Sequence, residues 1–298
     1  MNKMKVVISD DVIPQMLELI KETGAEVAYK PEPLYPALAD AEVLVIRSAT
    51  KVTPELLSHA KKLKMIIRGG VGLDNVDQEE CKKLGIEVAN TPTASTNAVA
   101  EFALALILST VRNIPKADSS MKAGKWEKKQ LKGTEISGKT LGLIGCGRIG
   151  SSLGEKASSL GMKILGYNPP PRHDCNFIEY ADTLEELLSQ ADVISLHVPS
   201  TPETENMINA QTISQMKDGA IIINTARGTI IDEGALYDAC KSGKIRTAAL
   251  DVYPTEPYTG KLTELDNVIL APHIAASTSE AQIRIGEEIA KKIRSLMD

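Results

Sequence analysis

Three residues far apart in the chain carry side chains suited to proton transfer and carboxylate binding. Arg227, Glu256 and His273 each follow a short apolar run of the kind that forms a buried strand. Ligands of open parallel sheets bind where strands end, so the three side chains could converge. An imidazole with an ordinary pKa of ~6.5 exchanges protons near neutrality. A carboxylate would fix its tautomer, and a guanidinium would bind a carboxylate with two parallel hydrogen bonds.

Each of these residues also has a plainer interpretation. A histidine after a proline, as in Pro272-His273, is more often structural, and Arg227 could belong to an ion pair. Asp251 could hold a binding cleft or Arg227, or be structural only. The combination at three strand ends favours a redox set, in which a proton donor and a positive charge act on one alkoxide.

A glycine turn supplies the second chemical feature. Gly145, Gly147 and Gly150 form a G-x-G-x-x-G that follows the apolar run 141–144 and precedes a helical stretch, 151–160. Strand, glycine turn and helix together are typical of a dinucleotide site. The first glycine permits a tight turn, the second lets the backbone approach a pyrophosphate, and the third allows close packing of helix on strand.

The residue that would select the dinucleotide departs from the usual rule. An acid about 20 residues past the glycines, at the end of the next strand, normally binds the ribose of NAD. Here that position holds Asn168, which can bind a ribose hydroxyl but does not repel a 2′-phosphate. Arg172 and His173 follow closely and could attract one. We favour NAD, and NADP is the alternative.

Composition excludes several classes of function. The net charge of −5 argues against nucleic acid or an anionic membrane as a partner. The hydrophobic content of 43% is enough for real cores. The four cysteines show no C-x-x-C spacing and are typical of free thiols in a reducing compartment, and no metal site is expected. No leader sequence is evident, so we expect a cytoplasmic protein.

Strand and helix patterns alternate along the whole chain, which predicts an α/β protein with two doubly wound parallel sheets. We expect a discontinuous substrate domain, 1–94 with 277–298, and a dinucleotide-binding domain, 95–276. The stretch 95–111 is helical and apolar nearly all round, so it should be buried on every side, between domains or between subunits. Expected strands cover residues 5–8, 26–29, 43–46, 64–67, 86–88, 141–144, 163–167, 193–198, 220–224, 247–250 and 267–270.

The chain resembles the D-isomer-specific 2-hydroxyacid dehydrogenases over essentially its whole length. The family pattern of G-x-G-x-x-G, N-x-x-R-G, D-V-x-x-x-E-P and Pro-His is present here. The stretches 47–52, 70–77 and 273–282 resemble the phosphoglycerate branch rather than the formate or lactate branches. The resemblance implies a Rossmann domain inserted in a flavodoxin-like substrate domain. It also implies a homodimer or higher homo-oligomer, with the helix after Ser95 at its centre and the segment around Trp126 reaching across it.

The resemblance also implies roles for single residues. Catalysis would rest on Arg227, Glu256 and His273. Arg47 and Arg68 would face a substrate phosphate, the backbone amides of Val71 and Gly72 would bind its carboxylate, and Asn97 would help to seat it. The cofactor would be lined by the glycines and by Arg148, Ile149, Asn168, Val198, Thr225, Ala226, Asp251 and Ala275.

We therefore expect NAD-dependent oxidation of 3-phosphoglycerate at C2, the first committed step toward serine. Two alternatives stay open. One is a broader reductase of 2-keto acids such as hydroxypyruvate, glyoxylate or the keto acid of D-lactate. The other is a non-enzymatic NAD-sensing protein that resembles the corepressors built on this fold. The chain ends at Asp298 after the last helix, so we expect no regulatory domain and no serine feedback through one.

Overall fold

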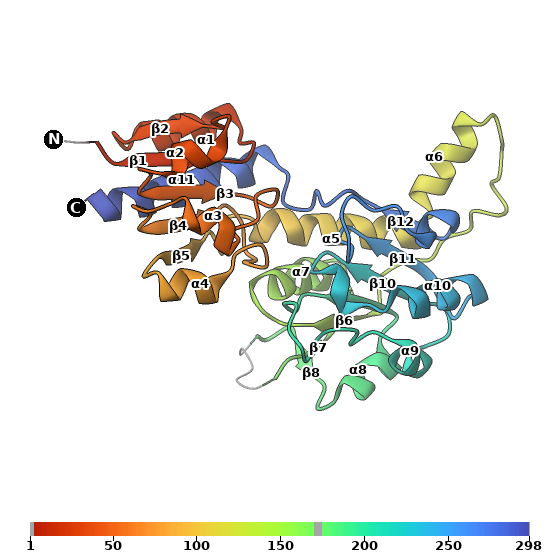
Figure 1. Cartoon of the computed structure of the whole chain (residues 1–298). Coiled ribbons are helices and arrows are strands. Elements are labelled where there is room, and N and C mark those ends of the chain that lie inside the picture. Colours follow the sequence, from red (N-terminus) through yellow and green to blue (C-terminus); the bar gives the residue numbers. More distant parts are fainter. Residues whose placement is uncertain (1–2, 170–174, 298) are drawn as a thin grey trace. The chain divides into compact units, whose positions relative to one another are not determined.

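The computed structural model describes residues 3–169 and 175–297 (Figure 1). Arg172 and His173, the basic residues considered for a 2′-phosphate, lie outside the described residues. The chain divides into two compact units, residues 1–96 with 276–298 and residues 97–275. Both are α/β units built on parallel sheets, which confirms the predicted fold class.

The first unit contains a five-stranded parallel sheet in the order β2-β1-β3-β4-β5. Alternate side chains of β1, β3 and β4 enter opposite cores, as the period of two requires. One core packs against α1 and α11 and the other against α2, α3 and α4. The elements are β1 (Lys5–Ile8), α1 (Pro14–Lys21), β2 (Glu26–Tyr29), α2 (Leu34–Leu38), β3 (Val43–Ile46), α3 (Pro54–Ser58), β4 (Met65–Arg68), α4 (Gln78–Lys83), β5 (Glu87–Asn90) and α11 (Ser279–Met297).

The second unit contains a seven-stranded parallel sheet in the order β12-β11-β10-β9-β6-β7-β8. Helices α5 and α7 cover one face, and α8, α9 and α10 cover the other. The elements are α5 (Thr96–Val111), α6 (Ile114–Lys122), β6 (Thr140–Ile144), α7 (Arg148–Ser159), β7 (Lys163–Tyr167), β8 (Glu179–Tyr180), α8 (Leu184–Gln190), β9 (Val193–Leu196), α9 (Ala210–Gln215), β10 (Ala220–Asn224), η1 (Gly228–Ile230), α10 (Glu233–Ser242), β11 (Ile245–Leu250), η2 (Lys261–Glu264) and β12 (Val268–Leu270).

Helix α5 is buried on one side in the single chain. Its inner side packs into the core through residues such as Ala103 and Ile107, both fully buried. A stripe at helical spacing, Glu101, Ala105 and Leu108, is exposed in the single chain. Burial on every side therefore stays a prediction that needs a partner subunit, because the single chain covers only the inner face of the helix.

One further difference is small. The two-residue strand β8 lies at the sheet edge and is too short for a periodic signal in the sequence. Among the described residues, no single helix combines the length and apolarity needed to cross a bilayer. Only α5 and α6 taken together would qualify, and they are bent by 63° at their junction.

Candidate active site

The glycine turn lies where the strand order of the second unit reverses. From β6 the chain adds β7 and β8 on one side and β9 to β12 on the other, so the turn after β6 is at a topological switch point. Gly145 has φ of 97°, a conformation that a side chain would strain. A Cβ at Gly145 would meet the His197 carbonyl at 2.7 Å, and one at Gly150 would meet the Gly145 carbonyl oxygen at 2.1 Å.

Gly147 differs from its two neighbours in the motif. It is the N-cap of α7, no side chain caps the helix there, and a Cβ at Gly147 would meet nothing within 4 Å. The first-turn amides, including those of Arg148 and Ile149, therefore have no side-chain cap, and the positive end of the helix dipole lies behind them. This is the arrangement that a pyrophosphate requires.

Two more observations fit a dinucleotide in this unit. Thr225, just past the end of β10, has a buried hydroxyl oxygen with no hydrogen-bond partner among the described residues. Val198 follows β9 across the switch point, and its Cγ1 would lie 3.0 Å from a Cβ at Gly145. Asn168 follows β7, accepts a hydrogen bond from the Cys146 amide at 3.3 Å and donates to the Pro169 carbonyl at 2.9 Å.

Arg227 stands on a tight loop at the end of β10. The buried Asn224 side chain closes the loop by accepting from the Ala226 amide at 3.0 Å and donating to the Arg227 carbonyl at 2.9 Å. The Arg227 guanidinium donates to the Ala226 carbonyl at 2.6 Å. Gly228 follows because a Cβ there would lie 1.9 Å from the Tyr253 carbonyl carbon. The loop that carries Arg227 therefore packs directly on the loop that leads to Glu256.

Glu256 and His273 are brought together. The Glu256 Oε2 lies 2.8 Å from the His273 Nδ1, and the Tyr253 amide donates to the Glu256 Oε1 at 3.2 Å. Both carboxylate oxygens are therefore engaged, which fixes the carboxylate against the imidazole. Both side chains are about two-fifths exposed, so the pair is accessible to a reactant.

The His273 backbone is held in a sparsely populated conformation with φ of 55°. The buried Asp251 explains how: its two carboxylate oxygens accept from the Ile274 and Ala275 amides, each at 2.8 Å. Burial raises the pKa of Asp251, although these two amides oppose the shift. Both Asp251 oxygens thus position the segment that follows His273. The predicted contact of Asp251 or Ala275 with a cofactor stays a prediction.

His197 lies behind the glycine turn rather than beside His273. Its Nε2 is 2.9 Å from the Ser195 hydroxyl, and its Cδ2 would be 3.5 Å from a Cβ at Gly150. Burial lowers the pKa of His197 to about 4, so the ring is neutral at physiological pH. This agrees with a core histidine whose hydrogen bond is satisfied.

In the first unit, Arg47 follows β3 where the order β2-β1-β3 reverses. The buried Asp10 carboxylate accepts from the Arg47 amide at 2.6 Å and from the Thr50 amide at 3.2 Å. Asn75 donates to the Arg47 and Thr50 carbonyls at 2.8 and 2.7 Å. The Arg47 guanidinium itself donates to the Gln282 amide oxygen, so three side chains, those of Asp10, Asn75 and Gln282, organise this strand end.

The other substrate candidates of the first unit follow β4. Arg68 is its last residue and pairs in register with Ile46, which places Arg47 and Arg68 at neighbouring strand ends. Beyond it, Asn90 donates to the Val71 carbonyl at 2.5 Å. No amide hydrogen bond to a described residue is made by Val71 or Gly72, which leaves both donors for a ligand.

Asn97 belongs to the second unit. It is exposed in the first turn of α5 and donates to Glu101 at 2.7 Å. Of the predicted substrate residues, Asn97 and Arg227 belong to the second unit and the others to the first.

Within residues 3–169 and 175–297, no group of three or more His, Cys, Asp or Glu side chains could hold a metal ion.

Some supporting residues have no signal of their own in the sequence. The Tyr253 hydroxyl lies 3.1 Å from the Leu250 carbonyl and 2.9 Å from the Ala271 carbonyl, and so ties the ends of β11 and β12 together. Burial raises the pKa of Tyr253 to about 12, which keeps this donor protonated. Arg47 has supporting residues of the same kind, namely Asp10, Asn75 and Gln282. A strand-end position could have suggested Asp10, but nothing in the sequence says which side chain each residue meets.

Comparison with known proteins now decides the family. A family model described as the NAD-binding domain of D-isomer-specific 2-hydroxyacid dehydrogenases matches residues 104–275, more than half of the chain. This chain belongs to that family. As a D-2-hydroxyacid dehydrogenase it uses a nicotinamide cofactor and acts on a small hydroxy or keto acid.

Individual relatives of the dehydrogenase differ in their named substrates. A hydroxypyruvate reductase of Thermotoga maritima is 51% identical over 260 residues, 86% of this chain and 85% of that protein. A D-3-phosphoglycerate dehydrogenase of Methanocaldococcus jannaschii is 46% identical over 300 residues, 98% of this chain but 57% of that protein. The chain thus spans little more than half the length of the second relative.

A solved structure agrees with both units of the dehydrogenase. The D-lactate dehydrogenase of Aquifex aeolicus, in complex with NAD and lactic acid, matches with a TM-score of 0.86 and 36% identity. The match covers 98% of this chain and 95% of that one.

Proposed function

We propose that this dehydrogenase oxidises 3-phospho-D-glycerate to 3-phosphohydroxypyruvate with NAD. The observation that carries the proposal is the organised strand end around Arg47. Asp10 and Asn75 hold the backbone of Arg47 at the carboxyl end of a parallel strand, and Gln282 accepts from its guanidinium, beside the strand end that bears Arg68. An arginine pair is suited to a phosphate monoester. Phosphoglycerate dehydrogenases among the relatives support the same substrate.

Proton transfer would be the task of His273. Because the Glu256 carboxylate engages Nδ1, the proton of the neutral ring belongs on Nδ1 and the lone pair on Nε2. Nε2 would accept the hydroxyl proton of the substrate, and the Glu256 charge would stabilise the resulting imidazolium. In the reverse direction the same nitrogen would donate the proton to the developing alkoxide.

Substrate orientation would come from charged and backbone donors. Arg227 would hold the carboxylate and the oxygen at C2, where its charge stabilises an alkoxide. The Val71 and Gly72 amides would bind the carboxylate, with Asn97 as a further donor. The Asn224 clamp supports the role of Arg227, because it fixes the loop before any ligand binds.

The cofactor would bind through the glycine turn of the second unit. Gly145, Gly147 and Gly150 with Arg148 and Ile149 would hold the pyrophosphate, and Val198, Thr225 and Ala226 would contact the rest. A bound nicotinamide would accept the hydride from C2. We favour NAD although Asn168 replaces the usual acid, because an amide still binds a ribose hydroxyl.

Reduction of unphosphorylated hydroxypyruvate is the second candidate. The relative named for that activity is the more identical of the two and is matched over most of its length. An assay that monitors NADH oxidation decides between the two substrates. It compares the rate with hydroxypyruvate with the rate with 3-phosphohydroxypyruvate. We expect the phosphorylated acid to have the higher kcat/KM. Equal kcat/KM values for the two acids would contradict the proposal that Arg47 binds a substrate phosphate.

The variant Arg47→Gln sharpens this comparison. It should lower kcat/KM at least ~10-fold for the phosphorylated acid and little for hydroxypyruvate, since one charge-assisted contact contributes roughly 1.5–3 kcal/mol. Lys51→Gln removes an exposed charge four residues on and serves as the control. An equal loss of kcat/KM for both acids would mean that Arg47 does not bind the phosphate.

The proton-transfer role is tested separately with His273→Ala. We expect kcat to fall by ~10²–10⁴-fold while the Kd for NADH stays nearly unchanged. Equal losses in both quantities would contradict the assignment. If the unaltered protein binds NADH tightly but turns over no 2-keto acid, the NAD-sensing alternative holds instead.

We also propose that the enzyme is a cytoplasmic homodimer. Besides the exposed stripe of α5, which includes Leu108, large exposed apolar side chains stand on α6 and just after it. Ile114 and Met121 are each 55% exposed and Trp126 is 79% exposed. Large exposed apolar side chains are typical of interaction sites, which supports an interface in this part of the chain.

A further inference from the structure

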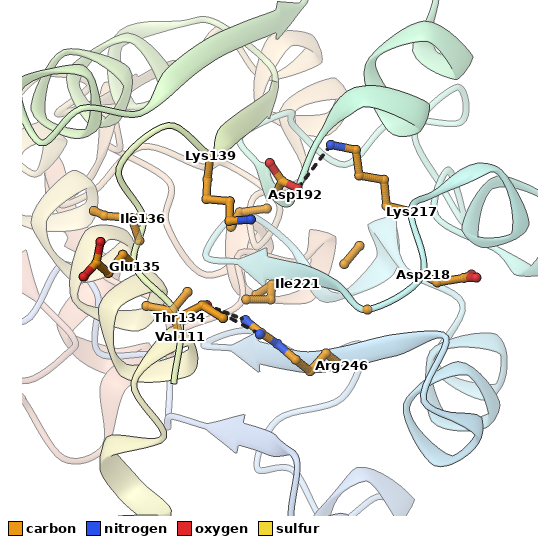
Figure 2. A pocket seen from close by; sticks show the side chains of 13 residues that line it. Val111, Thr134, Glu135, Ile136, Lys139, Asp192, Lys217, Asp218, Ile221 and Arg246 are labelled. Atoms are coloured by element: carbon orange, nitrogen blue, oxygen red, sulfur yellow. Dashed lines mark hydrogen bonds and ion pairs between the residues drawn. The ribbon is translucent and has the colours of Figure 1, made fainter. Parts of the chain in front are cut away.

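A cavity of about 170 Å³ opens in the second unit at the amino ends of its strands. Its walls include the first residues of β9 and β10, Val193 and Ala220, whereas the glycine turn and the Arg227 loop follow the carboxyl ends of the strands. The cavity is therefore separate from the proposed catalytic residues. Figure 2 shows the side chains that line it.

The charged groups that face this cavity are mainly cationic. Lys139 points into it, and the Arg246 guanidinium crosses its lower wall toward Thr134 (Figure 2). Two lining carboxylates, those of Glu135 and Asp218, point away from it in the same view. The Asp218 carboxylate is also neutralised by Lys244, at 2.8 Å.

The remaining carboxylate of the cavity, Asp192, is already matched. It accepts from the Lys217 ammonium at 3.1 Å and from the Thr140 amide at 2.8 Å. Burial opposes its ionisation, but this amide and the charges of Lys217 and Lys139 outweigh burial and hold the pKa of Asp192 below its usual value. The single charge of Asp192 is thus shared between Lys217 and Lys139, so the groups that face the cavity keep a positive excess that includes Arg246.

The Arg246 guanidinium makes few hydrogen bonds within the described residues. Its Nη1 and Nη2 approach only the Thr134 hydroxyl, at 3.5 and 3.4 Å, and neither Arg246 nor Lys139 forms an ion pair with any residue in the described ranges. A guanidinium fork of this kind matches two oxygens of a carboxylate or phosphate. Val193 and Ile221, each 2% exposed, form an apolar floor that lowers the local dielectric and strengthens such a contact.

We propose that this cavity binds a small oxyanion, a phosphate or a carboxylate, between Lys139 and Arg246. Its volume is below the ~300–1,000 Å³ of pockets that enclose drug-sized ligands. The anion would bridge the segment 134–139 to Arg246, the second residue of β11. Because Thr134 also donates through its amide to the Val111 carbonyl at 2.9 Å, binding would tie the end of α5 to the sheet.

Thermal unfolding of the full chain tests this proposal. Inorganic phosphate and citrate are titrated separately at constant ionic strength, with saturating NADH so that the nucleotide site cannot take the anion. A ligand that binds only the folded state raises Tm in proportion to its occupancy. We expect a saturable rise, and the anion with the lower half-saturation concentration identifies the preferred chemistry.

Single variants assign that rise to the cavity. Arg246→Gln and Lys139→Gln should each raise the half-saturation concentration ~10-fold or more, and Arg246→Lys should recover part of the loss because it restores the charge. Lys163→Gln removes an exposed cation from the same end of the sheet but outside the cavity, and should change nothing. Overturning results are no saturable rise with either anion, or a rise that is the same in both cavity variants and the control.

Discussion

At the scale of single residues, the three glycines of the turn have separable tasks. Gly145 and Gly150 are required by neighbouring backbone within the protein, whereas the space beside Gly147 is open. Only Gly147 therefore has no structural reason to be glycine, which leaves the approach of a ligand as its reason. This difference separates a cofactor turn from a merely tight turn.

Substitution by alanine should separate these tasks. Gly147→Ala should alter the free energy of unfolding by ~1 kcal/mol or less, as expected for an N-cap change, yet weaken NADH binding by at least ~10-fold. Gly150→Ala should cost ~1–3 kcal/mol or more, because its Cβ would overlap a carbonyl oxygen. Urea unfolding and NADH fluorescence titration measure the two effects. If Gly147→Ala binds NADH normally, the pyrophosphate lies elsewhere.

The buried His197 should control stability at mildly acidic pH. Its pKa is about 4 in the folded state and ~6.5 when unfolded, so above pH ~6.5 both states bind no proton and the stability is full. As pH falls from ~6.5 to ~4 the unfolded state takes up the proton first, which costs the folded state about 3 kcal/mol.

Urea midpoints across this pH range, compared between the protein and His197→Gln, measure the effect. The variant should start less stable, because it loses the contact with Ser195. It should then lose less stability than the original between pH 6.5 and 4. Parallel curves would show that His197 is not protonated differently in the two states.

At the scale of elements, the loops after the strands are tied to one another and not only to their own strands. Asn224 closes the β10 loop, Gly228 lets it contact the β11 loop, and Asp251 in the β11 loop holds the segment after β12. Three strand ends thus form one connected structure. This explains how residues 46 positions apart, 227 and 273, are held in one unit.

In the first unit Asp10 performs the corresponding task for Arg47. Asp10→Asn keeps the size but removes the charge that accepts from the Arg47 and Thr50 amides. We expect KM for the phosphorylated substrate to rise ~10-fold, with kcat and the Kd for NADH little changed, because only the placement of the guanidinium is affected. Asp11→Asn alters the neighbouring, exposed carboxylate and is the matched control. An unchanged KM in Asp10→Asn would show that this clamp does not govern substrate binding.

At the scale of the whole molecule, the exposed apolar residues of α5 and α6 are suited to contact a second copy of the chain. The pair Ile114→Lys and Met121→Lys should convert the proposed dimer to a monomer, which sedimentation velocity would detect. Leu160→Lys charges another exposed apolar residue, 47% exposed and outside this surface, and should leave the dimer intact. A protein that sediments as a monomer before any substitution would rule out this interface.

Much of this protein is determined by local patterns in its sequence. Apolar runs such as 43–46 and 220–224 predict strands because a parallel strand buries both faces. The glycine turn predicts its own conformation, since Gly145 must reach a positive φ. Chemistry-bearing residues just past strand ends can be recognised in the same way, because the direction of the chain decides at which edge they emerge.

Only the tertiary structure decides which side chain meets which. Arg47 contacts Gln282, 235 positions away, and Asp251 holds the segment of His273, and no periodicity encodes either partner. Which stripe of α5 the single chain leaves exposed could not be predicted for the same reason, since its composition is apolar on all sides. Local patterns follow from the preferences of a few neighbouring residues, whereas these contacts follow from the strand order and the packing of the whole sheet.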